Sequence, residues 1–404
     1  MEKKINYQHI LEKKKTPFYI FDEVGFIENY KEFEACMKQV YSLYKVSYSY
    51  KTNYTPYICK LVKRLGGYAE VVSDMEYLLA RKIGYKNSEI IYNGPAKGKM
   101  SYEHLLNEGI LNIDSIDEAK ELVEFSKKYR TKIFKVGLRI NLNISKDFIS
   151  RFGIDVENGD LKEVINLLKK QKNINIVGLH CHISRNRSLE TWEKRTKLML
   201  DLITLYFEET PEYISLGSGM FANMDSELKA QFNNVPTYKE YAEKTLKPIF
   251  DYFKNSEKKP IIFTEPGTTL VARYLNFVTK VLSIKNVQGK YFATLDGSYQ
   301  NLGEICTMKK LPIKVLKTTN EEKVSNIDLC GYTCLEQDLM YSNYLGKISK
   351  GDILMFENVG GYSIVSKPQF IKPNCSMISL DKNNNIKEIM REETFEDIFS
   401  KFEF

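Results

Sequence analysis

Short apolar runs alternate with amphipathic, helix-length segments between about residues 46 and 263. Apolar runs of this length, bounded by turn residues, are typical of strands in a parallel sheet that helices cover. The predicted strands are Val46–Tyr50, Tyr68–Val72, Glu89–Tyr92, Leu111–Ile113, Phe134–Ile140, Ile176–Cys181, Tyr213–Leu216 and Ile261–Phe263. The predicted helices between them include Met75–Lys82, Ile116–Tyr129 and Leu189–Phe207. Eight strands that alternate with helices predict a (β/α)8 barrel, the TIM barrel fold.

The pattern changes after Pro266, where apolar and aromatic runs are separated by turn-like pieces and predict an antiparallel β domain. The runs are Phe277–Lys285, Tyr291–Asp296, Asp328–Cys330, Ile353–Phe356 and Ser363–Val365. An earlier run, Phe18–Phe21, precedes the barrel, and we expect it to pair with this domain. The expected organisation is an N-terminal segment over 1–28, a barrel over 29–270 and a C-terminal β domain over 271–404.

Composition and charge narrow the possible partners. The hydrophobic fraction of 43% and the charged fraction of 27% are those of a globular protein. The net charge of +7 comes from lysines mixed with acids, whereas a nucleic-acid protein gathers its basic residues on one element. No apolar run has the length of a membrane-spanning helix, and the N-terminus is charged throughout. Nucleic-acid and membrane partners are therefore not expected.

Cysteine and histidine usage adds two further expectations. The seven cysteines are odd in number and contain no CxxC pair, so neither a disulfide framework nor a zinc knuckle is indicated. A reducing, cytoplasmic location fits this usage. The four histidines do not lie at ligand spacing with carboxylates, and no metal site is expected.

Polar residues follow the predicted strands, and in a barrel of this class function lies at the carboxyl ends of the strands. These residues are Lys51, Glu70, Asn93, Asp114, Arg139, His182, the Gly217-Ser218-Gly219 turn and Glu265. Any one of them is most simply a polar residue that opens a loop. Their occurrence at strand after strand indicates an active site.

The chemistry of these side chains suits a ring-shaped, phosphorylated cofactor. Lys51 follows an aromatic run, where partial desolvation would lower its pKa and make the amine nucleophilic. The Gly217-Ser218-Gly219 turn offers clustered backbone N–H groups that suit a phosphate. A carboxylate such as Glu265 beside a pyridine nitrogen keeps that nitrogen protonated, and a histidine such as His182 can stack on the ring. An isolated histidine in a strand is more often a core residue.

With these residues in place, the chain resembles the fold type III decarboxylases, the group of diaminopimelate and ornithine decarboxylases. The resemblance extends from about Pro17 to Lys372. The matching segments are Tyr48–Asn53, Ala69–Ser73, Ser150–Ile154, Gly178–His182, Glu265–Gly267, Cys334–Asp338 and Gly361–Tyr362. The resemblance implies an alanine racemase-like TIM barrel, a C-terminal β domain, the cofactor pyridoxal 5′-phosphate and the release of carbon dioxide from an amino acid.

The resemblance also implies a role for each matching residue. Lys51 would hold the cofactor as a Schiff base, Glu265 would pair with the pyridine nitrogen, and His182 would stack on the ring. Cys334 would reach the active site of a second subunit and return a proton after carbon dioxide leaves, which implies a homodimer with shared sites. The other expected cofactor contacts are Glu70, Arg139, Gly217, Ser218, Gly219, Gly267, Thr268 and Tyr362.

Departures from the family concern the substrate. The family has an arginine where this chain has Thr268, an acidic residue where it has Leu335, and Gly-Ser where it has Ser184-Arg185. The stretch 297–302 also lacks the arginine of diaminopimelate decarboxylases. The expected substrate-facing residues are Arg185, Tyr299, Leu335, Glu336 and Asp338. A leucine cannot pair with a buried ammonium, so we expect a non-standard or modified amino acid as substrate.

Two other functions remain open from the sequence. An amino-acid racemase can use the same barrel, although an alanine-type racemase usually places an arginine at the pyridine nitrogen, and this chain has Glu265 there. A catalytically silent relative that acts by binding is the other alternative, and the presence of Lys51 argues against it.

Overall fold

A computed structural model describes residues 5–144, 148–185 and 187–404. The chain divides into two compact units. The unit called here the β unit comprises Met1–Asn29, Ala222–Asn233 and Leu270–Phe404, and the barrel unit comprises Tyr30–Phe221 and Asn234–Thr269. The segment Ala222–Asn233, which the sequence-based bounds include in the barrel, therefore groups with the β unit.

The barrel unit contains a closed barrel of parallel strands. Its order is β2, β3, β4, β5, β6, β8, β9 and β10, and the ring closes because β10 pairs with β2. The bounds are β2 Tyr44–Ser49, β3 Tyr68–Val71, β4 Ile90–Tyr92, β5 Ile110–Ile113, β6 Phe134–Asn141, β8 Ile174–His180, β9 Tyr213–Ser215 and β10 Ile261–Thr264. The predicted barrel is confirmed, and each strand begins and ends within two residues of its predicted bounds. A short extra strand, β7 Ile154–Asp155, pairs with β6.

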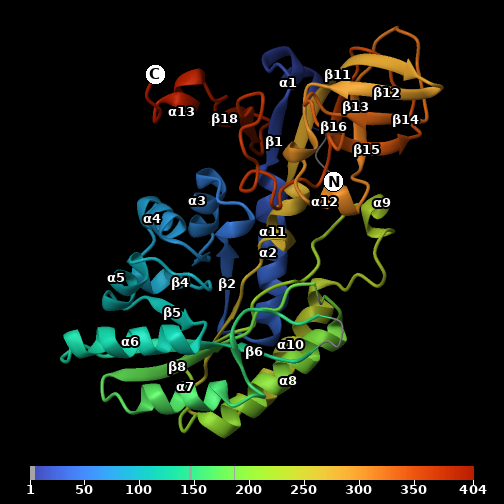
Figure 1. Cartoon of the computed structure of the whole chain (residues 1–404). Helices are drawn as coiled ribbons and strands as arrows, with labels where there is room; N and C mark the ends of the chain where they lie inside the picture. Colours follow the sequence, from blue (N-terminus) through green and yellow to red (C-terminus); the bar gives the residue numbers. More distant parts are fainter. Residues whose placement is uncertain (1–4, 145–147, 186) are drawn as a thin grey trace. The chain divides into compact units, whose positions relative to one another are not determined.

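Helices lie outside these strands (Figure 1). They are α3 Pro56–Arg64, α4 Asp74–Ile83, α5 Met100–Leu106, α6 Ile116–Lys128, α7 Asp160–Lys169, α8 Leu189–Tyr206 and α10 Tyr238–Phe253. Four of them begin at a hydroxyl residue whose oxygen accepts a backbone N–H of the first turn, which stabilises a helix start. These caps are Ser73, Ser115, Ser188 and Thr237.

The interior of the barrel changes from apolar to polar along the strands. A buried cluster of Ile91, Tyr213 and Phe263 packs against residues near the amino ends of the strands. The Tyr213 ring fits there because Gly137 and Gly178 have no side chain. A Cβ at either glycine would lie 2.0 to 2.2 Å from Tyr213. The Tyr213 hydroxyl donates a 2.7 Å hydrogen bond to Asn112, so the polar contacts of the interior begin at the edge of this cluster.

The β unit is built on one mixed sheet. The strands are β1 Phe18–Asp22, β11 Leu275–Val287, β12 Lys290–Leu295, β13 Ile313–Lys317, β14 Ile327–Cys330, β15 Leu339–Tyr344, β16 Ile353–Phe356, β17 Ser376–Leu380 and β18 Ile386–Met390. Strand β1 pairs antiparallel with β11 and parallel with β17, and β12 pairs parallel with β14. The predicted C-terminal β domain is confirmed, and these two pairings are parallel where antiparallel ones are predicted.

One predicted strand of the β unit does not form. Residues 363–365 lie in a bend and turn, since Tyr362 before them has a φ of +58° that takes the backbone out of the extended region.

The remaining helices are α1 Tyr7–Lys13, α2 Glu23–Val40, α9 Ser226–Lys229, α11 Thr268–Val271, α12 Ile305–Met308 and α13 Phe395–Phe399.

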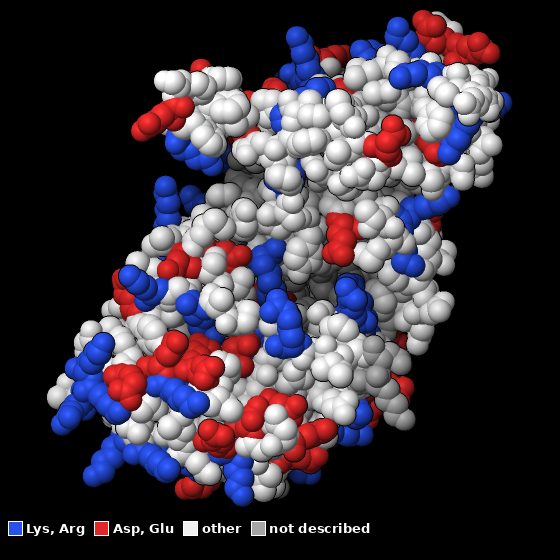
Figure 2. Space-filling model, viewed as in Figure 1, with Lys and Arg blue, Asp and Glu red and all other residues white. Residues whose placement is uncertain are grey.

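Two properties of the described residues bear on possible partners. None of the helices in this part of the chain combines the length and the apolar character needed to cross a membrane. On the face drawn in Figure 2, lysines and arginines are interspersed with acidic residues. This mixing agrees with the charge pattern of the sequence.

Candidate active site

Lys51 lies in the short 3-10 turn Tyr50–Thr52, directly after β2. Its Nζ atom is 2.6 Å from Oε2 of Glu70 on the neighbouring strand β3. Ser49 donates another hydrogen bond of 2.6 Å to the same oxygen. The Lys51 side chain keeps 31% of its surface exposed, whereas that of Glu70 keeps 1%. The amine therefore lies at the accessible end of a buried polar network. It follows an apolar run, as the sequence predicts, and it also has an ionic partner in Glu70.

Asn93 connects two carboxylates. Its side-chain nitrogen donates hydrogen bonds of 3.2 Å to Glu70 and 3.0 Å to Glu265. The orientation of the amide is fixed because its oxygen accepts a 2.8 Å hydrogen bond from Asn112. The lysine after β2 and the carboxylate after β10 thus belong to one hydrogen-bonded network at the ends of the strands.

Glu265 follows β10 and is buried. Its oxygens contact Nε2 of His180 at 3.0 Å and accept a 2.8 Å hydrogen bond from Ser215. Burial alone would raise the pKa of this carboxyl, but His180 and Lys51 outweigh burial and hold the pKa below its ordinary value. Glu265 is therefore ionised at neutral pH.

His182 packs against the glycine-flanked turn after β9. Its Nδ1 atom accepts a 3.1 Å hydrogen bond from the backbone N–H of Ser218. Burial, followed by the nearby charge of Lys51, lowers the pKa of the imidazole well below its ordinary value. The ring is therefore neutral at physiological pH. Gly217 has a φ of +60°, and a Cβ there would lie 2.6 Å from the Cβ of His182, so the turn and the histidine are in direct contact.

Arg139 is held at the carboxyl end of β6 by an ion pair. Its Nη1 atom lies 3.0 Å from Asp114, and both side chains are 7% exposed. The backbone N–H of Gly153 donates to the other Asp114 oxygen at 3.3 Å. The ring of Phe152 lies 4.9 Å from the Arg139 guanidinium carbon. The segment 150–154 therefore packs on this ion pair.

Three other predicted residues of the barrel unit differ in exposure. Gly267 is buried against Thr52, since a Cβ on this glycine would lie 2.0 Å from the threonine Oγ1. Thr268 next to it is partly buried. Arg185 is exposed, has a φ of +71°, and places its guanidinium carbon 5.7 Å from the centre of the Phe148 ring.

The predicted residues of the β unit lie on two loops and in the 3-10 turn Tyr299–Asn301. Asp338 is buried and accepts hydrogen bonds from the Ser298 hydroxyl at 3.1 Å and the Tyr299 backbone N–H at 2.8 Å. It also accepts two from Thr333, at 3.1 Å from the backbone and 2.6 Å from the hydroxyl. Both carboxylate oxygens are thus occupied in holding the loop that carries Cys334, whose side chain is exposed.

The neighbours of Cys334 and the turn at Tyr362 complete this set. Leu335 is partly buried and Glu336 is exposed. Tyr362 is 40% exposed. Its backbone carbonyl accepts a hydrogen bond from the hydroxyl of Ser366.

Sequence reasoning missed the polar residues inside the barrel strands. These residues are Asn112, His180, Tyr213 and Ser215. Each lies within an apolar run, where a single polar residue does not disturb a strand prediction. The sequence signal that could have found two of them is their spacing. Asn112 precedes Asp114 by two residues and His180 precedes His182 by two, and residues two apart on a strand share a face.

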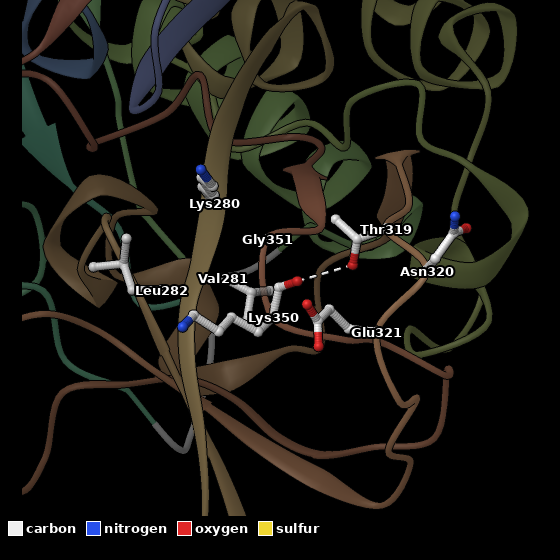
Figure 3. A pocket seen from close by; sticks show the side chains of 8 residues that line it. All are labelled: Lys280, Val281, Leu282, Thr319, Asn320, Glu321, Lys350 and Gly351. Atoms are coloured by element: carbon white, nitrogen blue, oxygen red, sulfur yellow. Dashed lines mark hydrogen bonds between the residues drawn. The ribbon is translucent and has the colours of Figure 1, made fainter.

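A hollow of about 520 Å³ lies elsewhere, within the β unit. Figure 3 shows Lys280, Glu321 and Lys350 around it, and a 2.9 Å hydrogen bond from the Thr319 hydroxyl to the backbone carbonyl of Lys350. None of the predicted site residues lines it. Across the described residues, no group of three or more His, Cys, Asp or Glu side chains could hold a metal ion.

The barrel site fits pyridoxal phosphate by three observations. A lysine amine reaches the accessible end of the network, a buried and ionised Glu265 faces the interior, and the neutral His182 offers an uncharged ring. The turn after β9 also leaves room for a phosphate beside the backbone at Gly219, where an added Cβ would meet only the Ile183 carbonyl oxygen, at 3.6 Å. A TIM barrel with these groups at the carboxyl ends of its strands defines the class of cofactor-dependent lyases and isomerases that react at the α-carbon of amino acids.

The family is shown by a match to its sequence model. Residues 26–272 match the family described as "Pyridoxal-dependent decarboxylase, pyridoxal binding domain". The chain therefore belongs to the pyridoxal phosphate-dependent decarboxylases. It is a carbon–carbon lyase that uses pyridoxal phosphate and acts on an amino acid, and this match favours decarboxylation over the racemase alternative.

Similar proteins match nearly the whole chain at low identity. Diaminopimelate decarboxylase of Methanocaldococcus jannaschii is 26% identical over 97% of this chain and 92% of its own length. The enzyme of the same name from Helicobacter pylori is 26% identical over 98% of this chain and 97% of its own length. A crystal structure of the M. jannaschii enzyme in complex with L-lysine has a TM-score of 0.85 at 25% identity, and covers 98% of this chain and 94% of that one.

Proposed function

We propose that this decarboxylase acts on an amino acid whose distal end is neutral, acylated or attached to a larger group. The observation that best supports decarboxylation is the network that joins Lys51, Glu70, Asn93 and Glu265 at the carboxyl ends of the strands. It combines an amine that can bind the cofactor covalently with a carboxylate that is ionised at neutral pH.

Within this proposal the barrel residues divide the work on the cofactor ring. When bound, pyridoxal phosphate accepts the electron pair that the α-carbon retains as carbon dioxide leaves. Lys51 would hold the cofactor through its amine. Glu265 would keep the pyridine nitrogen protonated, because its low pKa leaves the proton on the nitrogen. His182, neutral and partly buried, would support one face of the ring.

Backbone groups would hold the phosphate. In the Gly217-Ser218-Gly219 turn the N–H of Ser218 donates to His182 and that of Gly217 to Ser215, so we assign the N–H of Gly219, where φ is +118°, as the phosphate donor. The backbone of Gly267 and Thr268 would add donors. Arg139, already paired with Asp114, would keep the cofactor side of β6 in place.

Cys334 would return a proton to the α-carbon after carbon dioxide has left. Its thiol is exposed on a loop fixed by the hydrogen bonds of Asp338. We propose that it serves the site of a second copy in a homodimer.

All seven cysteines are free thiols, which is compatible with a cytoplasmic location.

We infer the substrate class from side chains that could not neutralise an ammonium at the distal end of an amino acid. Leu335 offers no charge, Thr268 stands in place of a cation, and both oxygens of Asp338 already accept hydrogen bonds. An ammonium at the distal end of a substrate would therefore lack a partner unless Glu336 supplied one. Arg185 and Tyr299 are available for an anionic or polar group on a modified substrate.

Replacement of Lys51 tests the proposed chemistry. We expect Lys51→Ala to lose the visible absorbance of bound cofactor, the borohydride-reducible linkage and carbon dioxide release, because no other amine replaces it. Lys60→Ala, at an exposed lysine of α3, is the matched control. Retention of a reducible linkage in Lys51→Ala would refute the assignment of this lysine, and racemisation by the wild type without carbon dioxide release would refute decarboxylation.

A further inference from the structure

Arg195 on α8 is a fully buried cation. Its Nη1 atom donates a 2.8 Å hydrogen bond to the backbone carbonyl of Leu216, and its Nη2 atom donates a 3.2 Å hydrogen bond to that of Ile183. The guanidinium carbon lies 4.2 Å from the centre of the Trp192 ring, one helical turn earlier. The guanidinium is thus fixed by two carbonyls and one aromatic face.

No carboxylate within the described ranges lies at ion-pair distance from Arg195. Burial of a charge without an ionic partner is unfavourable, and two backbone carbonyls offset only part of that cost. Burial lowers the pKa of the guanidinium, yet an arginine stays protonated in proteins. The fold therefore keeps a protonated guanidinium at this position, on which the charge of Glu265 acts from beyond ion-pair distance.

The two carbonyls belong to the two segments that meet at the proposed phosphate site. Ile183 follows His182, and Leu216 precedes Gly217. The segments also touch directly, since the Ser218 N–H donates to His182 and Gly217 packs against the histidine Cβ. Arg195 therefore links the histidine segment to the turn from the side of the helix.

We propose that Arg195 is a positioning residue for the cofactor phosphate. It holds the Gly217-Ser218-Gly219 turn in register with His182, and its buried charge favours a dianion on the open side of the turn. A buried positive charge stabilises an anion through the protein interior without contact, as an oriented helix terminus does. This inference rests on the proposed function, in which the turn holds the phosphate.

The test compares two ligands that differ only in the phosphate. The affinities of the full-length apoprotein for pyridoxal phosphate and for pyridoxal are measured by equilibrium dialysis, so catalysis is not the readout. Their ratio reports the phosphate contribution, because both ligands present the same aldehyde to Lys51. We expect the neutral variants Arg195→Gln and Arg195→Met to lower this ratio by about ten- to thirtyfold, the scale of one partly buried charge acting on an anion.

Two variants separate charge from packing. Arg195→Lys keeps the charge, and we expect it to retain most of the ratio even if its melting temperature falls. Thr196→Val, at the next and equally buried position of α8, is a control and should leave the ratio unchanged. If the neutral variants weaken both ligands equally, Arg195 has only a structural role and the proposal is wrong. The proposal is also abandoned if neither neutral variant folds.

Gly217→Ala distinguishes this inference from the proposed function. The added Cβ would collide with His182 and must displace the turn. A ratio that falls in Gly217→Ala but not in the Arg195 variants contradicts this inference alone. A ratio that is unchanged in Gly217→Ala contradicts the assignment of the turn itself.

Discussion

The charge of Glu265 depends on one neighbour more than on any other. Burial opposes ionisation of this carboxyl, and His180 at 3.0 Å is the main group that reverses the effect. A carboxyl whose pKa is lowered in the folded state stays ionised as the pH falls through the ordinary carboxyl range. Any stabilisation that it contributes is complete above the ordinary pKa and is lost only as the pH falls through the lower, folded value.

Replacement of His180 is therefore expected to change the pH profile. In His180→Gln burial acts on Glu265 with less opposition, so the pKa of the carboxyl rises and the acid limb of kcat/KM moves to higher pH. The rate at the acid end should fall by about tenfold or more relative to wild type, since each pKa unit changes the ionised fraction tenfold there. His104→Gln, at another buried histidine, should leave the limb in place. An acid limb that does not move in His180→Gln would contradict this role.

At the scale of elements, the turns after the strands fix the positions of the reactive groups. Gly267 follows β10 and packs on Thr52, the residue next to Lys51. A methyl group on Gly267 must displace the turn that carries the amine, and overpacking of this kind costs about 1–3 kcal/mol. The position of Lys51 after β2 thus depends on the turn after β10, the strand that pairs with β2.

Gly267→Ala is expected to lower the melting temperature and to reduce kcat by at least about tenfold, because a displacement of the amine misaligns the reacting groups. Gly159→Ala is the control. Gly159 has a φ of +100°, so alanine there strains the backbone, but its added Cβ would meet nothing within 4 Å and we expect turnover to be unchanged. Wild-type turnover in Gly267→Ala would show that the close contact is not needed.

The sequence predicts those elements that local pattern determines. The barrel strands are found because each is an apolar run between turn residues, and Lys51, Glu265 and His182 are found because they follow such runs. The pairing of β1 with β17 and of β12 with β14 is not predicted, because register between distant segments leaves no local signal. The contact of His180 with Glu265 is missed for the same reason, since it joins residues 85 positions apart.

At the scale of the whole molecule, the proposed homodimer can be tested by subunit exchange. If Cys334 serves the site of the other subunit, mixtures of inactive Lys51→Ala and inactive Cys334→Ala protein should regain activity, up to about one quarter of wild type, because half of the dimers are mixed and each has one intact site. Activity is measured after exchange has been verified by mass. The absence of recovery would mean that both residues serve one site or that Cys334 is not catalytic.

The central claim is decarboxylation with a pocket that does not accept a free distal ammonium. The most direct test is carbon dioxide release by the cofactor-loaded protein from matched pairs: ornithine, lysine and meso-diaminopimelate, each beside its distally acylated form. We expect the acylated member to exceed the free one by about a hundredfold or more in kcat/KM, the scale of an unpaired buried charge. Efficient turnover of free meso-diaminopimelate or ornithine would contradict the account.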